Sequence, residues 1–140
     1  MDLEQIKKIL PHREPMLLVE HVDLIGNDEA KGRYTIKGDE WFLRGHFPSN
    51  PVVPGVMLCE MMAQACCALL DSKVTNDTTP YFTQLDKVKF RRPVKPGDTF
   101  ESHCRITRVK SPFYFAEATG YVDGNVAVSA MLSFALMQNV

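Results

Sequence analysis

The sequence predicts an α+β protein in which a strongly curved antiparallel sheet wraps one long, buried helix. The first observation is an apolar run over residues 52–70 whose only charged residue is Glu60. The second is the character of the chain after Pro80, where segments of alternating apolar and polar residues are separated by turn signals. A helix that is apolar on nearly all sides must be buried on most of them, which a curved sheet achieves and a flat sheet does not.

The sequence of the N-terminal third predicts one short helix and a hairpin. Apolar residues recur at helical spacing over residues 3–10, so an amphipathic helix is expected to end before Pro11. Residues 17–25 and 29–37 are predicted to form two strands, joined at the turn Gly26-Asn27-Asp28.

The middle of the chain predicts a long loop and then the central helix. The loop spans residues 38–54, and loops of that length in compact domains are often functional. The helix is expected to begin at Pro54 or Gly55, because proline is tolerated in a first turn, and to end at about Ser72.

The C-terminal half predicts the rest of the sheet. Strands are expected over residues 81–90, about 100–107, 113–122 and 125–137, and Asp123-Gly124 is the strongest hairpin signal in the chain. The sum is one long helix and about six strands. No internal repeat or linker divides the 140 residues, so we expect a single domain over residues 1–140.

Composition narrows the class of protein. With 45% hydrophobic and 24% charged residues the chain is of ordinary globular type, and its net charge of −1 gives no overall attraction to nucleic acid or acidic membranes. The first residues carry neither a basic nor an apolar signal region, and Glu60 in the centre of the apolar run disfavours a membrane span. Four cysteines without C-x-x-C spacing fit the reducing cytoplasm.

The most informative chemistry lies in the loop and at the start of the helix. The loop carries His46 among three prolines, and an imidazole that is largely neutral at pH 7 accepts a proton. Burial disfavours the charged form of Glu60, which would leave this acid able to donate one. Together His46 and Glu60 could catalyse an elimination reaction. The alternatives are that His46 only anchors the loop, and that Glu60 forms a buried salt bridge with a lysine or arginine.

Three stretches resemble one family, the FabZ type of β-hydroxyacyl-[acyl-carrier-protein] dehydratases. The central one reads Gly45-His46-Phe47-Pro48-x-x-Pro51-Val52-x-Pro54-Gly55-Val56, then Glu60-Met61-Met62-Ala63-Gln64. The opening one is Leu10-Pro11-His12-Arg13-x-Pro15, and the third is Asp86-Lys87-x-x-Phe90-x-x-Pro93-Val94-x-Pro96-Gly97-Asp98. The resemblance spans nearly the whole chain. Glu14 and Glu20 depart from the family pattern, and neither touches the proposed chemistry.

The resemblance implies the hot-dog fold and the conversion of (3R)-hydroxyacyl-[acyl-carrier-protein] to the trans-2-enoyl thioester and water, in fatty-acid biosynthesis. It implies that His46 is the base and Glu60 the acid, paired across a homodimer whose subunits join their sheets edge to edge. The family often assembles further into a hexamer, as a trimer of dimers.

Two further residues have candidate roles. The resemblance implies that the Gly55 backbone N–H, at a helix start where such groups lack partners, receives the thioester oxygen. Pro54-Gly55 could also be only a turn into the helix. Gln64 lies four residues after Glu60 on the same helical face and could orient its carboxyl group, although packing would also explain it. His12 and Arg13 have no obvious step in the reaction, and we interpret them as structural.

A local basic cluster is the candidate docking surface for the acidic acyl carrier protein and its phosphopantetheine arm. A solvated strand edge protected by lysines is an equal alternative. The cluster consists of Lys87, Lys89, Arg91, Arg92 and Lys95.

No metal or organic cofactor is expected, because the four histidines lack ligand spacing and no phosphate or dinucleotide loop is present. No base-reading motif indicates nucleic acid. The rival functions are a dehydratase that also isomerises the trans-2 double bond to cis-3, a hot-dog thioesterase, and a non-catalytic acyl-binding protein. The long motif match through His46 and Glu60 favours a dehydratase over a thioesterase, and the presence of both a base and an acid argues against a non-catalytic protein. The acid is Glu, as in the FabZ type, whereas the isomerising relative typically has Asp.

Overall fold

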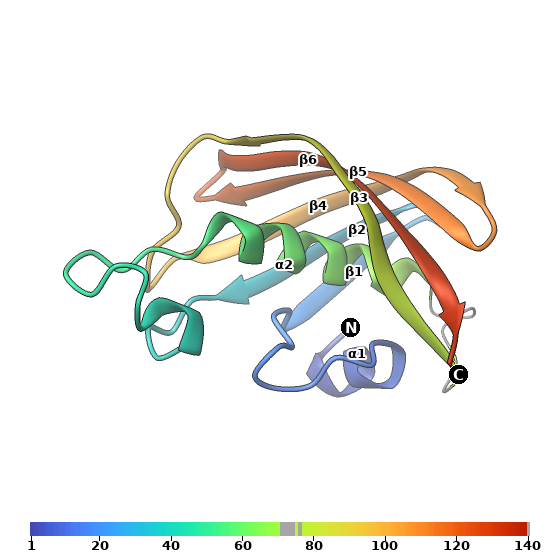
Figure 1. Ribbon diagram of the computed structural model, residues 1–140, viewed down its shortest axis with the longest axis horizontal. Helices are drawn as coiled ribbons and strands as arrows, with labels where there is room; N and C mark the ends of the chain where they lie inside the picture. The colour runs from blue at the N-terminus through green and yellow to red at the C-terminus, as the bar shows by residue number, and fades with distance from the viewer. Residues whose placement is uncertain (71–74, 76, 140) are drawn as a thin grey trace.

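The computed structural model describes residues 1–70, 75 and 77–139 (Figure 1). Within them the chain forms two α-helices, two short 3₁₀ turns and one six-stranded sheet. The helical elements are α1 (Leu3–Ile9), η1 (Trp41–Leu43), α2 (Gly55–Cys67) and η2 (Ala68–Leu70). The strands are β1 (His21–Ile25), β2 (Glu29–Thr35), β3 (Thr78–Phe90), β4 (Thr99–Lys110), β5 (Phe113–Val122) and β6 (Asn125–Gln138).

The sheet confirms the predicted architecture. Its order is β1-β2-β4-β5-β6-β3, every neighbouring pair is antiparallel, and it curves around α2 (Figure 1). The helix contacts β2, β4, β5 and β6. None of the helices in the described ranges is both long and apolar enough to cross a membrane.

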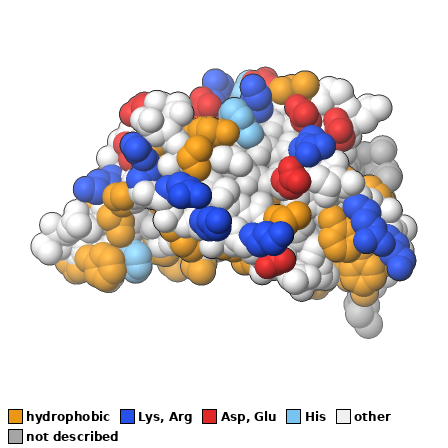
Figure 2. Space-filling model, turned by 90° about the horizontal axis from the view of Figure 1, so that it is seen from above, with side chains coloured by type: hydrophobic (Ala, Val, Ile, Leu, Met, Phe, Trp, Pro, Cys, Tyr) orange, Lys and Arg blue, Asp and Glu red, His pale blue; other side chains and the backbone are white. Residues whose placement is uncertain are grey.

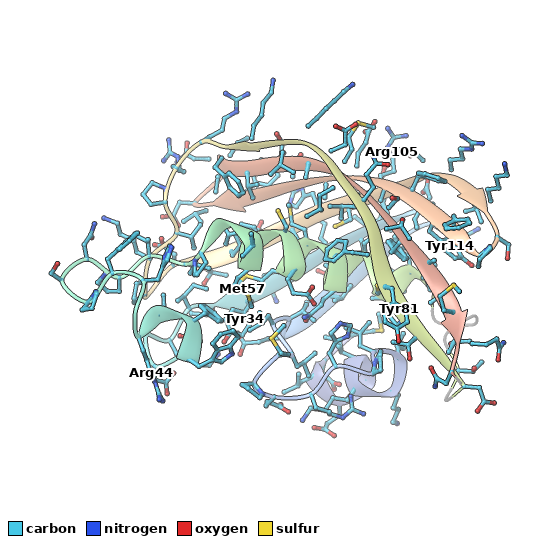
Figure 3. The ribbon with its side chains drawn as sticks, in the orientation of Figure 1. Tyr34, Arg44, Met57, Tyr81, Arg105 and Tyr114 are labelled. Atoms are coloured by element: carbon cyan, nitrogen blue, oxygen red, sulfur yellow. The ribbon has the colours of Figure 1, made fainter. Side chains whose placement is uncertain are left out.

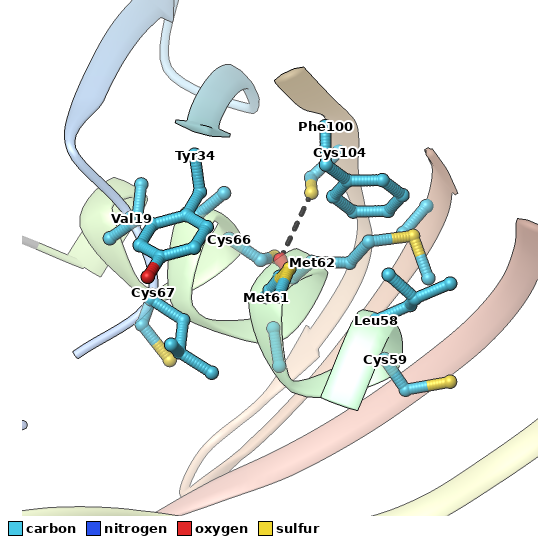
Figure 4. Close-up of a cluster of buried hydrophobic side chains, with 14 of the residues drawn as sticks. Val19, Tyr34, Leu58, Cys59, Met61, Met62, Cys66, Cys67, Phe100 and Cys104 are labelled. Carbon is cyan, nitrogen blue, oxygen red and sulfur yellow. Dashed lines mark hydrogen bonds between the residues drawn. The ribbon is translucent and has the colours of Figure 1, made fainter. Parts of the chain in front are cut away.

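The helix α2 is buried along most of its length, in a core rich in sulfur and aromatic side chains (Figure 4). Gly32 on β2 allows this close approach, because a Cβ there would lie 2.7 Å from the Cβ of Ala65. The Cys104 Sγ donates to the Met62 carbonyl oxygen at 3.2 Å. The cysteines are free and buried, and burial holds the pKa of Cys67 well above its usual value, so this thiol stays protonated.

Several predicted boundaries differ from the structure. Strand β2 ends at Thr35 and not at residue 37, β3 begins at Thr78 and not at residue 81, and β4 continues to Lys110 and not only to about residue 107. The first strand begins at His21 and not at residue 17, because the Leu18 N–H donates to Gln64 Oε1 at 2.8 Å instead of joining a ladder. The helix ends at Cys67 and continues only as η2 to Leu70, while the predicted end at Ser72 lies outside the described residues.

The loop over residues 38–54 is fixed at its base by one carboxylate. Glu40 accepts hydrogen bonds from the Tyr34 hydroxyl at 2.8 Å, the Lys37 N–H at 2.9 Å and the Gly38 N–H at 2.8 Å. Burial opposes ionisation of Glu40, but these hydrogen bonds outweigh it and lower its pKa. The loop therefore leaves the sheet in a defined direction.

The two edges of the sheet differ in character. The edge strand β1 has five residues, whereas β3 has thirteen and is exposed along most of its length. Its large apolar side chains stand in solvent, with Tyr81 56% and Phe90 54% exposed (Figure 3 labels Tyr81). An edge strand of this length and apolarity is a template for pairing with another strand.

Candidate active site

His46 is held by the loop in one tautomer. Its Nδ1 lies 3.0 Å from the Val52 carbonyl oxygen, and the Val52 N–H donates back to the His46 carbonyl at 3.0 Å. A carbonyl oxygen only accepts, so Nδ1 carries the proton in the neutral ring and Nε2 keeps a free lone pair. The loop that anchors His46 thereby also prepares Nε2 as a proton acceptor.

Glu60 lies on α2 with its side chain 19% exposed. No Lys or Arg nitrogen in the described part of the chain lies within ion-pair distance of its carboxyl group. The salt bridge considered from the sequence is therefore not formed among these residues. Instead, Glu60 Oε2 accepts from Gln64 Nε2 at 2.8 Å, while Oε1 has no partner among the residues described.

Gln64 is 1% exposed and its amide is fully engaged. Its Oε1 accepts the Leu18 N–H at 2.8 Å, and its Nε2 donates to the Met16 carbonyl at 2.7 Å as well as to Glu60. These two backbone contacts fix which end of the amide faces Glu60, because the amide oxygen must face the Leu18 N–H. The sequence predicted that Gln64 lies beside Glu60. The structure shows that two backbone contacts also fix the orientation of the Gln64 amide.

Gly55 is the first residue of α2, as the sequence predicted. Its N–H has no hydrogen-bond partner within the described ranges. A Cβ at this position would lie 2.6 Å from Cε1 of Phe90, so glycine is required for the ring to pack there. An open hollow of about 540 Å³ adjoins this helix start and is lined by Gly55, Val56, Phe90, Arg91 and Arg92 among others.

The single chain does not bring the base and the acid into contact. The partners of His46 are Val52 and the stacked ring of Phe47, whereas those of Glu60 are Gln64 and His12. In Figure 1 the loop that carries His46 extends beyond the N-terminal end of α2.

His12 is a neighbour of Glu60 that the sequence did not reveal. Its Nε2 lies 3.4 Å from Glu60 Oε2, and its Nδ1 is buried without a hydrogen-bond partner in the described structure. Arg13, by contrast, has the structural role expected of it. Its guanidinium donates to the carbonyls of Lys7 and Leu10, both at 2.9 Å, and so closes the C-terminal end of α1.

A cavity of about 30 Å³ lies against Glu60. Aromatic and apolar side chains from β3 and β6 form its far wall, among them Tyr81, Phe82 and Phe134. The acid thus faces an apolar space. Across the described ranges, no group of three His, Cys, Asp or Glu side chains could hold a metal ion.

All members of the basic cluster are exposed, and none forms an ion pair with a described residue. Figure 2 shows the molecule from above the view of Figure 1, a face on which Lys and Arg side chains alternate with Asp, Glu and hydrophobic ones. Arg91 and Arg92 line the hollow at Gly55, so these two members of the cluster lie beside the candidate site.

Known proteins resemble this chain over nearly its whole length. Residues 10–131 match the FabA-like domain family. A 3-hydroxyacyl-[acyl-carrier-protein] dehydratase FabZ of Clostridium perfringens is 40% identical over 137 residues, which are 97% of this chain and 99% of that protein. The enzyme of the same name from Oenococcus oeni is 43% identical over 136 residues, 96% of this chain and 98% of its own.

Solved structures share the fold at low identity. The dehydratase heterocomplex ApeI:P of Xenorhabdus doucetiae superposes with a TM-score of 0.82 at 21% identity, covering 95% of this chain and 91% of that one. A mutant thioesterase of Pseudomonas aeruginosa gives a TM-score of 0.71 at 13% identity, covering 99% and 95%. These likenesses confirm the hot-dog fold. With the family match and the full-length relatives, they lead to one assignment: the chain belongs to the FabA-like dehydratase family, as a member of the FabZ type.

Proposed function

We propose that this protein dehydrates (3R)-hydroxyacyl-[acyl-carrier-protein] to the trans-2-enoyl thioester and water in type II fatty-acid biosynthesis. Its full-length relatives are named 3-hydroxyacyl-[acyl-carrier-protein] dehydratases. The observation that carries the proposal is the hydrogen bonding of two titratable groups. His46 Nδ1 is occupied and leaves Nε2 to accept a proton, and Glu60 Oε2 is occupied and leaves Oε1 to donate one.

The reaction uses three groups. His46 Nε2 removes the α-proton, which the thioester carbonyl acidifies, and the Gly55 N–H stabilises the negative charge that develops on the carbonyl oxygen. The C–O bond then breaks as Glu60 Oε1–H protonates the departing hydroxyl, so that water leaves and the double bond forms. A proton passed from His46 back to Glu60 restores the enzyme. These groups supply every step, and we assign no metal or organic cofactor.

The acid and base act in one site only if two chains meet. The exposed apolar edge strand β3 supports a homodimer formed by pairing of this strand with its copy, and burial of Tyr81, Phe82, Leu85 and Phe90 would drive the association. We propose that His46 of one subunit then faces Glu60 of the other, that three dimers form a hexamer, and that residues 1–140 act as one cytoplasmic domain.

Mixing inactive variants tests this pairing. Protomers carrying His46→Ala and Glu60→Gln are unfolded and refolded together at equal amounts. Random pairing makes half of the dimers mixed, each with one intact site of two, so about one quarter of the wild-type activity should return. Each variant refolded alone is the control. No recovery in samples where native mass spectrometry detects the mixed dimer would place both residues in one subunit's site.

Turnover products test the reaction itself. Hydration and double-bond isomerisation are followed together on crotonyl- and long-chain enoyl-[acyl-carrier-protein]. Reversible hydration without isomerisation is expected. Formation of a cis-3 product would indicate the isomerising type of dehydratase, and release of free acid would indicate a thioesterase.

The basic cluster is proposed to attract the acidic carrier protein. Replacing Lys87, Arg91 and Arg92 with Ala should raise KM for the carrier-protein substrate, most clearly at low salt. Turnover of a short N-acetylcysteamine thioester, which carries no protein, should stay unchanged. A matched variant removes the same charge from exposed residues elsewhere, namely Lys8, Lys31 and Arg33. An equal rise in KM for both triple variants would contradict a localised docking surface.

A further inference from the structure

Two nitrogen atoms converge on one oxygen of the acid. Gln64 Nε2 lies 2.8 Å from Glu60 Oε2, and His12 Nε2 lies 3.4 Å from the same atom. The side chains of His12 and Glu60 are similarly buried, 21% and 19% exposed. The other oxygen, Oε1, has no hydrogen-bond partner among the residues described. The surroundings of the carboxyl group are therefore asymmetric, with both donors on one side.

The burial of His12 favours one tautomer of its neutral ring. Its Nδ1 is buried without a described partner, so a proton there would be a buried donor that meets no acceptor. The tautomer with its proton on Nε2 leaves Nδ1 as an unpaired acceptor instead, which folded proteins tolerate more often than an unpaired N–H. This tautomer also places an N–H close to Glu60 Oε2, with the nitrogen 3.4 Å from that oxygen.

The backbone that carries His12 is anchored on both sides. The Arg13 guanidinium donates to the His12 carbonyl at 2.6 Å and to the Lys7 and Leu10 carbonyls at the end of α1. Leu10 itself is 1% exposed in the core. The segment that carries His12 is thus tied to a helix on one side and to the core on the other.

We propose that His12 is a positioning residue for Glu60. As a neutral N–H donor it acts with Gln64 to keep Oε2 the accepting oxygen, so that the acid's proton is carried and released by Oε1. This inference rests on the proposed function, in which Glu60 protonates the leaving hydroxyl. When the proton leaves, the carboxylate gains more from two N–H donors than the neutral acid did, and this difference lowers the barrier.

Two substitutions distinguish the contribution of the His12 N–H from that of the ring volume. His12→Gln keeps an N–H near the Nε2 position and cannot titrate, whereas His12→Phe keeps the ring volume and has no N–H. His21→Phe, at a partly exposed histidine whose ring hydrogen-bonds to Asp23, is the matched control. Melting temperature and KM are measured for all three variants, together with kcat as a function of pH.

The expected result is a loss of kcat in His12→Phe that His12→Gln largely restores. The loss should be roughly tenfold, below the about 10²-fold of a well-aligned donor, with KM and melting temperature unchanged. The alkaline limb of the kcat profile should also move to higher pH, because a lost donor disfavours the carboxylate. The titratable groups around this cavity are His12, Glu60, Cys67 and Tyr81, and Cys67 is held in its protonated form.

Two results would overturn the inference. One is wild-type kcat and an unmoved pH profile in His12→Phe. The other is an equal loss in His12→Phe and His12→Gln with lowered melting temperatures, which would leave His12 as packing only. Glu60→Gln is measured beside them. If it keeps full turnover, Glu60 is not the acid and the proposed function itself fails, whereas an inactive Glu60→Gln beside a fully active His12→Phe removes only the role of His12.

Discussion

Replacing Gln64 with methionine tests whether this one side chain both stabilises the fold and orients Glu60. The two residues are similar in size, so the change removes hydrogen bonds without leaving a large cavity. The buried Leu18 N–H and the partly buried Met16 carbonyl would both lose their partner, and Glu60 would lose its closest donor. The variant therefore perturbs stability and chemistry through separate contacts.

The magnitude follows from these contacts. The buried Leu18 N–H left unpaired costs about 1–3 kcal/mol, and the partly buried Met16 carbonyl costs less, because water can reach it. Burying an apolar side chain recovers part of this, so we expect Gln64→Met to lower the free energy of unfolding by about 2 kcal/mol. Turnover should also fall, by roughly tenfold or more, as Glu60 loses its fixed orientation.

Urea unfolding at a fixed protein concentration measures the stability effect. With a slope near 2 kcal/mol/M, the midpoint should fall by about 1 M while the slope stays constant. Gln138→Met, at an exposed glutamine near the end of β6, is the control and should change the midpoint little. A loss below about 0.5 kcal/mol in Gln64→Met would refute the reasoning, because the buried backbone groups would then have found other partners.

Three further predictions concern the loop and two close contacts. Glu40→Gln should destabilise the fold by about 1–2 kcal/mol at pH 7. Because folding lowers the pKa of Glu40, the wild-type advantage should be full above the ordinary glutamate value near 4.5, shrink below that value, and be lost as the pH falls through the lowered pKa of the folded state. Unfolding of both proteins at pH 7 and at several lower pH values checks this. Gly55→Ala should reduce turnover but cost less than about 1 kcal/mol of stability, because the half-exposed Phe90 ring can swing away from the new methyl group. Gly120→Ala should cost about 3 kcal/mol, since its Cβ would meet the fully buried Phe100 ring at 2.1 Å, and equal thermal shifts for both glycine variants would contradict this contrast.

Local signals predicted the C-terminal hairpin well. The turn Asp123-Gly124 has positive φ at both residues, 51° and 77°, and joins β5 and β6 at the boundaries that the sequence indicated. Such turns are selected by the residues within them, so no distant contact was needed. The apolar run likewise predicted that α2 is buried, because burial on all sides follows from composition.

Contacts between distant segments were not predictable in the same way. The first strand starts late because Gln64, far along the chain, captures the Leu18 N–H. His12 reaches Glu60 only through the packing of α1 and the segment after it, which no local pattern encodes. The exposure of β3 depends on the order of strands in the sheet, and periodicity reveals a strand without revealing its neighbours.

The strand order also has a consequence for how the chain is made. Strand β3 precedes β4, β5 and β6 in sequence, yet its partner in the sheet is β6. Leu85, for example, is synthesised well before Leu132, the residue with which it pairs. At a synthesis rate of about 5–20 residues per second, the ribosome delivers that partner seconds later. Meanwhile the apolar α2, which β4, β5 and β6 cover in the finished fold, emerges without its cover. During those seconds the apolar surfaces of β3 and α2 are exposed and prone to aggregation. A chaperone that shields apolar segments would be most useful to the chain at this stage.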